Sequence, residues 1–218
     1  MRHTRTILLS ILALALIASC AYAQRTPGTY SIGAFGGVAM PQGPEEFKDY
    51  FKSGLGFGGE FKYNVNPKMS LAGSFSMVNF GYNVDQLEKE FDLEGAKLTV
   101  DGGGVKVNVI QANVLYYLMP AGSATELYAI GGGGYYMMTP KNPDKVEIEF
   151  EGEKLDITEM FEMGEEESEN DFGVQFGVGM DLPLGSMNLF FEGKYHIVFT
   201  EDESTKLLSV MAGLRFPM

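Results

Sequence analysis

Charged residues recur at alternating positions in three otherwise apolar segments of this chain. Glu60 and Lys62 lie in the first segment, Glu192 and Lys194 in the second, and Arg215 in the third. If the segments are strands, alternation places these charges on one face. Their mixed signs suit an enclosed space, where buried charges must pair. We therefore predict an interior charge network made of Glu60, Lys62, Glu192, Lys194 and Arg215.

Two further features could carry chemistry but fit structural roles better. His196 shares parity with Glu192 and Lys194, so it should point into the same interior, and no serine lies at a spacing that suggests a Ser-His pair. Gly131–Gly134 is not followed by the Lys-Ser/Thr of a phosphate loop. Four glycines in a strand instead allow tight coiling and close approach of large side chains. We expect no enzymatic activity, no cofactor and no metal site.

The first 23 residues have the three parts of an export signal. Two arginines precede the apolar run Ile7–Ile17, and the segment closes on Ala-Tyr-Ala. We expect cleavage between Ala23 and Gln24, which makes 1–23 the signal peptide and 24–218 the mature domain. The apolar run is too short to span a bilayer as a helix.

Cys20 leaves an alternative to that cleavage. Residues 17–20 resemble a lipobox, in which the cysteine would be lipidated. Ordinary cleavage after Ala23 is favoured, because a chain that spans the membrane needs no lipid anchor. The mature chain then has no cysteine, and neither a disulfide nor a cysteine metal site is possible.

The composition excludes one class of partner. The chain has 16 basic and 29 acidic residues; the signal holds two of the basic ones and no acidic one, so the mature chain carries a net charge of −15. A nucleic-acid partner is excluded on that ground, because it requires a basic face. The 28 glycines and 27 Phe and Tyr residues favour strands over helices.

Period-two alternation of apolar and polar residues predicts eight strands. In 187–199, for example, Phe191 and Tyr195 fall on the face opposite Glu192 and Lys194. In 104–118 the polar residues change parity, and a bulge near residues 109–110 would restore the phase. The expected strands span 29–40, 54–64, 69–82, 104–118, 126–139, 171–181, 187–199 and 206–216.

The connections alternate between short and long. The second, fourth and sixth are turns with proline or glycine, whereas the first, third and fifth run over about 41–53, 83–103 and 140–170. Bacterial outer-membrane barrels have this form, with tight periplasmic turns and longer outside loops. The pattern predicts an all-β fold: an eight-stranded antiparallel up-and-down transmembrane β-barrel with long acidic extracellular loops.

A soluble eight-stranded barrel of the lipocalin kind is the alternative architecture. Its charged face would meet water, so neighbouring charges would need no partners. Here the charges mix signs on one parity while the opposite faces are apolar, which favours the membrane interpretation. Aromatic residues at segment ends would form the interfacial girdles: Tyr63, Tyr82, Tyr117, Phe199 and Phe216.

The mature chain resembles the OmpA/OmpX-type outer-membrane β-barrel domain superfamily. The residues that carry this likeness are Tyr128-Ala129-Ile130-Gly131-Gly132-Gly133-Gly134-Tyr135-Tyr136, Leu189-Phe190-Phe191-Glu192-Gly193-Lys194-Tyr195 and Val210-Met211-Ala212-Gly213-Leu214-Arg215-Phe216. The resemblance implies insertion by the barrel-assembly machinery, which reads a C-terminal strand ending in an aromatic residue. This chain departs from that ending, because Pro217-Met218 follows Phe216.

The third and fifth connections each contain an alternating segment that turns at a glycine. Residues 91–100 and 146–157 therefore read as β-hairpins. They would prolong the barrel wall into a protruding sheet whose edge could recruit an extracellular partner by strand addition. Residues 144–171 also hold 13 acidic residues against two lysines. A solvated, self-repelling loop is favoured there, and divalent-cation binding stays open.

Two functions fit this architecture. The first is a structural or surface-interaction barrel of adhesion-like role, whose lumen is filled by side chains. The alternative is a narrow channel or transport barrel for small, possibly apolar solutes, with room left by Ser70, Ala72, Ser74 and Ser76. In either case we expect a monomer in contact with outer-membrane lipid and lipopolysaccharide.

Overall fold

The computed structural model describes residues 25–90, 96–150, 152–160, 168–201 and 203–218. The expected signal peptide and its cleavage site at Ala23 and Gln24 lie outside these residues. Cleavage therefore stays a prediction.

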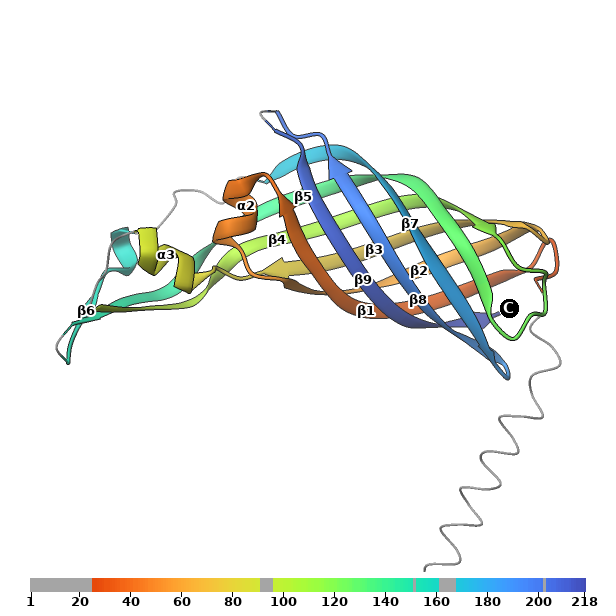
Figure 1. Cartoon of the computed structure of the whole chain (residues 1–218), viewed down its shortest axis with the longest axis horizontal. Coiled ribbons are helices and arrows are strands. Elements are labelled where there is room, and N and C mark those ends of the chain that lie inside the picture. Colours follow the sequence, from red (N-terminus) through yellow and green to blue (C-terminus); the bar gives the residue numbers. More distant parts are fainter. Residues whose placement is uncertain (1–24, 91–95, 151, 161–167, 202) are drawn as a thin grey trace, which may run out of the picture.

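Eight antiparallel strands form a closed ring in which each strand pairs with its neighbours in the chain (Figure 1). Pairing of β4 with β5 and of β1 with β9 closes the ring. The eight-stranded up-and-down barrel is thus confirmed. Its strands are β1 (Tyr30–Gly43), β2 (Gly54–Asn66), β3 (Met69–Phe80), β4 (Ala96–Tyr117), β5 (Glu126–Phe150), β7 (Glu169–Leu184), β8 (Met187–Val198) and β9 (Thr205–Pro217).

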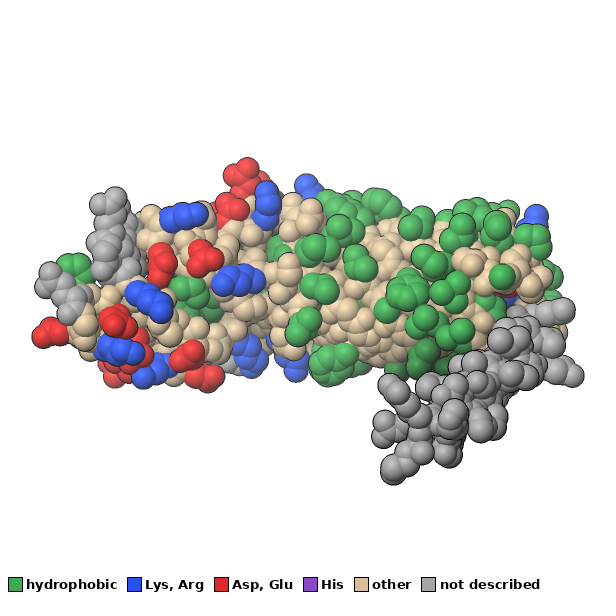
Figure 2. Space-filling view, turned by 60° about the horizontal axis from the view of Figure 1, so that its bottom comes forward, with side chains coloured by type: hydrophobic (Ala, Val, Ile, Leu, Met, Phe, Trp, Pro, Cys, Tyr) green, Lys and Arg blue, Asp and Glu red, His purple; other side chains and the backbone are tan. Residues whose placement is uncertain are grey.

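Alternation along each strand separates a lipid-type surface from the interior. On β8, the Phe191 side chain is 38% exposed whereas that of Glu192 is 5% exposed. Figure 2 shows hydrophobic side chains spread over the barrel and charged ones gathered at one end. An apolar outer band with a polar interior is the pattern of a membrane barrel.

The bulge expected near residues 109–110 is absent, and that prediction was wrong. From Val105 to Tyr116, β4 pairs with β3 without a shift in register. Lys106 and Asn108 therefore point outward, near the end of the barrel wall, and Val107 and Val109 point inward. The sequence changes parity because the lumen itself changes from polar to apolar along β4.

Two of the aromatic residues assigned to the girdles do not face outward. Tyr117 is buried in the lumen, and Tyr82 is half-buried and stacks on Phe51 with ring centroids 5.4 Å apart. Tyr30 and Tyr116 are exposed at the same barrel end as Tyr63. Tyr117 was misassigned because one residue of register moves a side chain to the other face.

The connections distinguish the two ends of the barrel. The three short turns and the C-terminus lie at one end, here called the short-turn end (Figure 1). At the other end, the long-loop end, two helices that composition did not predict appear: α2 (Glu45–Tyr50) and α3 (Val84–Glu90). Of the helices in the described ranges, none is long and apolar enough to cross a membrane.

At the long-loop end, β4 and β5 continue past the ring as a paired extension (Figure 1). Residues 96–101 of β4 pair with residues 145–150 of β5, and β6 (Glu153–Asp156) folds back on β5. The extension is defined here as these three segments. The second hairpin and the protruding sheet are therefore present. Of the hairpin expected over 91–100, residues 96–100 pair with β5, while 91–95 lie outside the described residues, so that hairpin stays a prediction.

Candidate functional site

The lumen contains a hydrogen-bonded set of charges centred on Arg215, whose side chain is fully buried. Its Nη2 group donates to Glu60 Oε2 at 3.1 Å and to Glu192 Oε1 at 2.6 Å. Its Nε donates to Glu60 and its Nη1 to Asp181. One guanidinium thus binds three carboxylates, which suits the five-donor fork of arginine.

Lys62 occupies the same layer of the lumen, nearer the short-turn end. Its Nζ lies 3.1 Å from Asp181 Oδ2 and donates to the Tyr117 hydroxyl at 3.0 Å. Tyr117 in turn donates to Asp181 Oδ2 at 3.0 Å. Asp181 therefore joins Lys62 to Arg215.

Lys194 closes the set on the long-loop side. Its Nζ lies 3.0 Å from Glu192 Oε2, and the Tyr128 hydroxyl donates to Glu192 Oε1 at 3.0 Å. The structure thus brings together all five residues singled out from the sequence and adds one more carboxylate, that of Asp181. Three cations face three anions, so the buried set is neutral, as enclosure requires.

Arg25 extends the polar layer to the short-turn end. Its guanidinium lies 3.6 Å from the centre of the Tyr117 ring, its Nε lies 2.8 Å from Glu126 Oε2, and its Nη2 donates to the Met119 carbonyl at 2.8 Å. The backbone amide of Gly122 also donates to Glu126 at 2.8 Å. Arg25, which directly follows the expected first mature residue, therefore binds residues at this end of the lumen.

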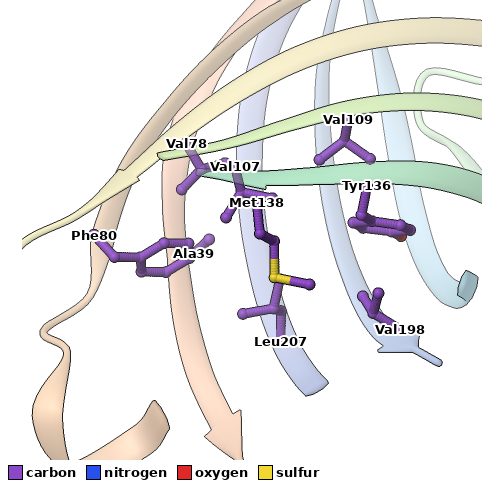
Figure 3. Close-up of a cluster of buried hydrophobic side chains, with 9 residues drawn as sticks. All are labelled: Ala39, Val78, Phe80, Val107, Val109, Tyr136, Met138, Val198 and Leu207. Atoms are coloured by element: carbon purple, nitrogen blue, oxygen red, sulfur yellow. The ribbon is translucent and has the colours of Figure 1, made fainter. Parts of the chain in front are cut away.

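Toward the long-loop end, the lumen becomes apolar. Hydrophobic side chains from six strands converge there (Figure 3), and Phe47 of α2 packs on Phe80 with ring centroids 5.5 Å apart. The apolar layer therefore lies between the charged layer and the long loops. Its members are Ala39, Val78, Phe80, Val107, Val109, Tyr136, Met138, Val198 and Leu207.

His196 lies between the two layers. Its Nε2 is 2.8 Å from Ser209 Oγ on β9, and its Nδ1 is 2.9 Å from the Tyr136 hydroxyl. Sequence spacing did not indicate this serine, because the pairing of β8 with β9 brings Ser209 close. Both residues are buried and line a cavity of ≈ 30 Å³, room for about one or two water molecules.

Two of the small residues of β3, Ser70 and Ala72, contact larger side chains in the lumen. Ser70 donates to Asn64 Oδ1 at 2.7 Å, and Ala72 packs among larger residues from β4 and β5. The rings of Tyr117 and Tyr128 lie 5.0 Å apart between their centroids and fill this part of the lumen. Ala72 thus packs with Tyr117 and Tyr128, whereas Ser76 lines the cavity of ≈ 30 Å³ beside His196.

The mouth at the long-loop end is open and acidic. A cavity of ≈ 1060 Å³ is lined there by α2, by the start of β7 and by the connection between β8 and β9. Within the described ranges, no group of three or more His, Cys, Asp or Glu residues is arranged to hold a metal ion. The densest acidic residues, 165–167, lie outside those ranges. The carboxylates that line the mouth are Glu45, Glu46, Glu169, Asp171, Glu201 and Glu203.

Sequence reasoning missed several members of the lumen. Asp181 alternates with the apolar residues of its strand, and that parity was the available signal. Tyr117, Tyr128 and Arg25 gave no comparable signal, since aromatic residues fit either face of a membrane strand and Arg25 precedes the first strand.

Comparison with known proteins agrees with this fold. Residues 9–216 match the family described as outer membrane protein beta-barrel domain. The solved structure of Neisserial surface protein A (NspA) is similar, with a TM-score of 0.51 and 12% identity over 86% of this chain and 96% of that one. A major outer membrane protein from Thermus thermophilus has a TM-score of 0.51 and 10% identity, over 88% of this chain and 100% of that one. No curated protein sequence matches this chain.

The matched family covers nearly the whole chain, and the closed ring of eight antiparallel strands has the apolar exterior that a bilayer requires. The chain is therefore a member of the outer membrane protein beta-barrel domain family, located in the bacterial outer membrane.

Proposed function

We propose that this protein is a non-enzymatic surface-interaction barrel whose lumen is closed by its own side chains. The observation that carries the proposal is that the lumen is divided into two layers: a layer of paired charges with no net charge, and an apolar layer. Between them, beside His196 and Ser209, lies a cavity of ≈ 30 Å³. A filled lumen leaves the long-loop end as the part that can meet partners.

The charged layer supports closure because its members hold one another across the bore. Arg215 reaches carboxylates on three other strands: Glu60 on β2, Asp181 on β7 and Glu192 on β8. An ion crossing this layer would have to break several buried ion pairs. Each such break leaves an uncompensated charge, which costs about 3–5 kcal/mol.

The extension supports a surface role. β4 and β5 run beyond the ring, and β6 adds a third strand at the distal tip. We infer that this end faces outward, because membrane barrels keep short turns in the periplasm and long loops outside. The extension then projects from the cell surface, where strand addition could recruit a partner.

The buried pair of His196 and Ser209 does not favour an enzymatic function. His196 and Ser209 are enclosed beneath the apolar layer, and the third group on the histidine is the Tyr136 hydroxyl rather than a carboxylate. Lipid substrates on the outer surface would have no path to this serine. We infer that these contacts serve packing.

Planar-bilayer conductance tests the closed lumen. The full mature protein should give no stable single-channel steps. A variant with Phe80→Ala and Leu207→Ala opens only the apolar layer and should not conduct. Adding Arg215→Met to this variant also disrupts the charged layer, and the triple variant should conduct. Stable steps from the unaltered protein would instead favour the narrow transport barrel.

Replacement of the extension tests the surface role. Residues 84–101 and 144–167 would each be exchanged for a short Gly-Ser linker, and attachment of expressing cells to each other and to coated surfaces would be measured. We expect attachment to be lost while the barrel stays heat-modifiable on gels. The same linker in place of residues 120–123, at the short-turn end, is the matched control. Unchanged attachment without the extension would contradict the proposal.

A further inference from the structure

The extension is an amphipathic sheet. Register within it places alternate residues of the three strands on a common face. One face is mostly apolar and carries Ala96, Leu98, Val100, Val146, Ile148, Phe150 and Leu155, together with Glu153 opposite Phe150. The opposite face carries Lys97, Thr99, Lys145, Glu147, Glu149, Lys154 and Asp156.

Near the barrel the apolar face is covered, but at the distal tip it is not. Leu98 and Val146 are buried, and the amide of Leu98 donates to Glu88 Oε1 of α3 at 2.8 Å. At the tip, Phe150 is 52% exposed and Leu155 is 65% exposed. Exposed apolar residues at the end of a sheet are typical of an interaction surface.

Among the described residues, the outer edge of β6 at the tip has no strand partner. The amide of Ile157 donates to the Val146 carbonyl at 2.9 Å, so alternation turns the backbone groups of Leu155 toward β5 and those of Lys154 and Asp156 away from it. In the described part of the sheet, β5 is the one strand that pairs with β6. An unpaired edge is a template for another strand.

The sequence of this edge is complementary to itself. In an antiparallel pair of two β6 strands, the backbone groups that face outward, those of Lys154 and Asp156, must meet. Because opposite charges are favoured across a pair, the register that sets Lys154 opposite Asp156 of the other copy is preferred. Leu155 then faces Leu155 on the two-fold axis, as an isologous interface requires. Asp156 accepts from Thr158 through Oδ1, so its Oδ2 can accept from the lysine.

We propose that β6 pairs antiparallel with β6 of a second copy of this chain. The extension continues along the long axis of the barrel (Figure 1), so copies in one membrane present β6 in the same direction. Antiparallel pairing therefore joins copies that face each other from two membranes. This inference rests on the proposed surface role and names its partner: the same protein on a neighbouring cell.

The charge of the long-loop end makes this contact dependent on salt. Carboxylates line the mouth of each copy, so two copies repel each other at low ionic strength. Salt screens that repulsion, since the Debye length falls to about 8 Å at about 0.15 M. Self-association should therefore increase with salt, whereas binding of a basic partner would decrease.

Cysteine cross-linking tests the register. The mature protein would be placed in nanodiscs that hold one copy each, so every dimer joins two membranes. Leu155→Cys introduces a single cysteine into the mature chain, and the opposed Cα atoms of a non-hydrogen-bonded pair, about 4.5 Å apart, suit a disulfide. Met160→Cys is the control, because Met160 is 82% exposed, more than Leu155, but lies outside the paired strand.

Under mild oxidation, Leu155→Cys should dimerise at least about tenfold faster than Met160→Cys, because pairing raises its effective concentration. Equal or slower dimerisation would overturn the proposal. Lys154→Glu should abolish salt-promoted clustering of nanodiscs, whereas Lys97→Glu, with the same change of charge on β4, should not. Equal clustering by the two variants would also overturn it.

The two proposals can fail separately. If Leu155→Cys does not cross-link but removal of the extension still abolishes cell attachment, the surface role stands and pairing of two copies is wrong. If the cross-link forms but the unaltered protein conducts, pairing stands and the closed lumen is wrong.

Discussion

Arg215 on β9 donates from Nη2 to Oε2 of Glu60 on β2, at 3.1 Å and across 155 positions of sequence. β1 lies between these strands in the ring, so the contact spans the curvature of the wall. The same guanidinium also binds Asp181 and Glu192. Arg215 thus links β9 to three other strands by hydrogen bonds inside the barrel.

The coupling between Glu192 and Arg215 is testable by a double-mutant cycle. Arg215→Met leaves three buried carboxylates with two lysines, so its loss should cost about 3–5 kcal/mol of unfolding free energy. Glu192→Gln should cost less, and the double variant less than the sum of the two. Urea unfolding in lipid vesicles measures all four proteins. Additive effects within about 0.5 kcal/mol would show that the two residues do not share a network.

Two neighbouring glycines on β5 should differ in their tolerance of alanine. A Cβ at Gly132 would meet the Ala112 carbonyl and the Asn113 side chain, and would lie 2.9 Å from Asn113 Cα, whereas one at Gly131 meets nothing within 4 Å. Gly132→Ala should lower the unfolding free energy by about 1–3 kcal/mol through overpacking. Gly131→Ala, the matched control, should stay within about 0.5 kcal/mol of the parent. Similar losses in both would contradict this packing.

The two faces of β8 predict unequal effects at adjacent positions. Phe191→Lys places a charge on the lipid-facing side and should cost about 2–4 kcal/mol near the bilayer midplane. Glu192→Gln should be milder, because the interior hydrogen bonds can be partly replaced. Vesicle unfolding of both variants checks this order, and equal costs would contradict the outward placement of Phe191.

Orientation in the membrane can be tested by proteolysis of intact cells. The long-loop end should be accessible from outside, so protease should cut within 140–170. The turn at 119–125 should be protected until the outer membrane is permeabilised. Cleavage in the reverse pattern would show that the barrel is inserted the other way round.

The Asp156 carboxylate gives the tip a dependence on pH. The Thr158 hydroxyl and backbone amide both donate to Asp156 Oδ1, at 2.6 and 3.0 Å, and lower the pKa of that carboxyl. Because the pKa of Asp156 is lower in the folded tip, its ionised carboxylate stabilises the tip fully at pH values above the ordinary aspartate pKa of about 3.9. That contribution is lost as the pH falls through the lowered pKa. Thr158→Val should raise the pKa of Asp156, measured by carboxyl NMR. Thr139→Val, whose hydroxyl contacts Ser168 instead, should leave it unchanged.

Alternation alone predicted the barrel, its ring of eight strands and the inward faces of Glu60, Lys62, Glu192, Lys194 and Arg215. The parity of Glu192 and Lys194 against Phe191 could be read from the sequence because strand side chains alternate strictly across a wall that is apolar outside. The alternation of short and long connections likewise predicted that the short turns gather at one end of the barrel and the long loops at the other. These are local properties of the chain, and they do not depend on which strands pair with each other.

Only the tertiary structure decided which inward residues meet and where the lumen changes character. Tyr117 and Tyr128 enter the charged layer, Ser209 reaches His196, and residues 96–101 pair with residues 145–150 of β5. Each of these contacts depends on strand register and on ring closure, which bring together residues far apart in sequence. A shift of one residue would exchange the two faces, so local pattern cannot fix such contacts.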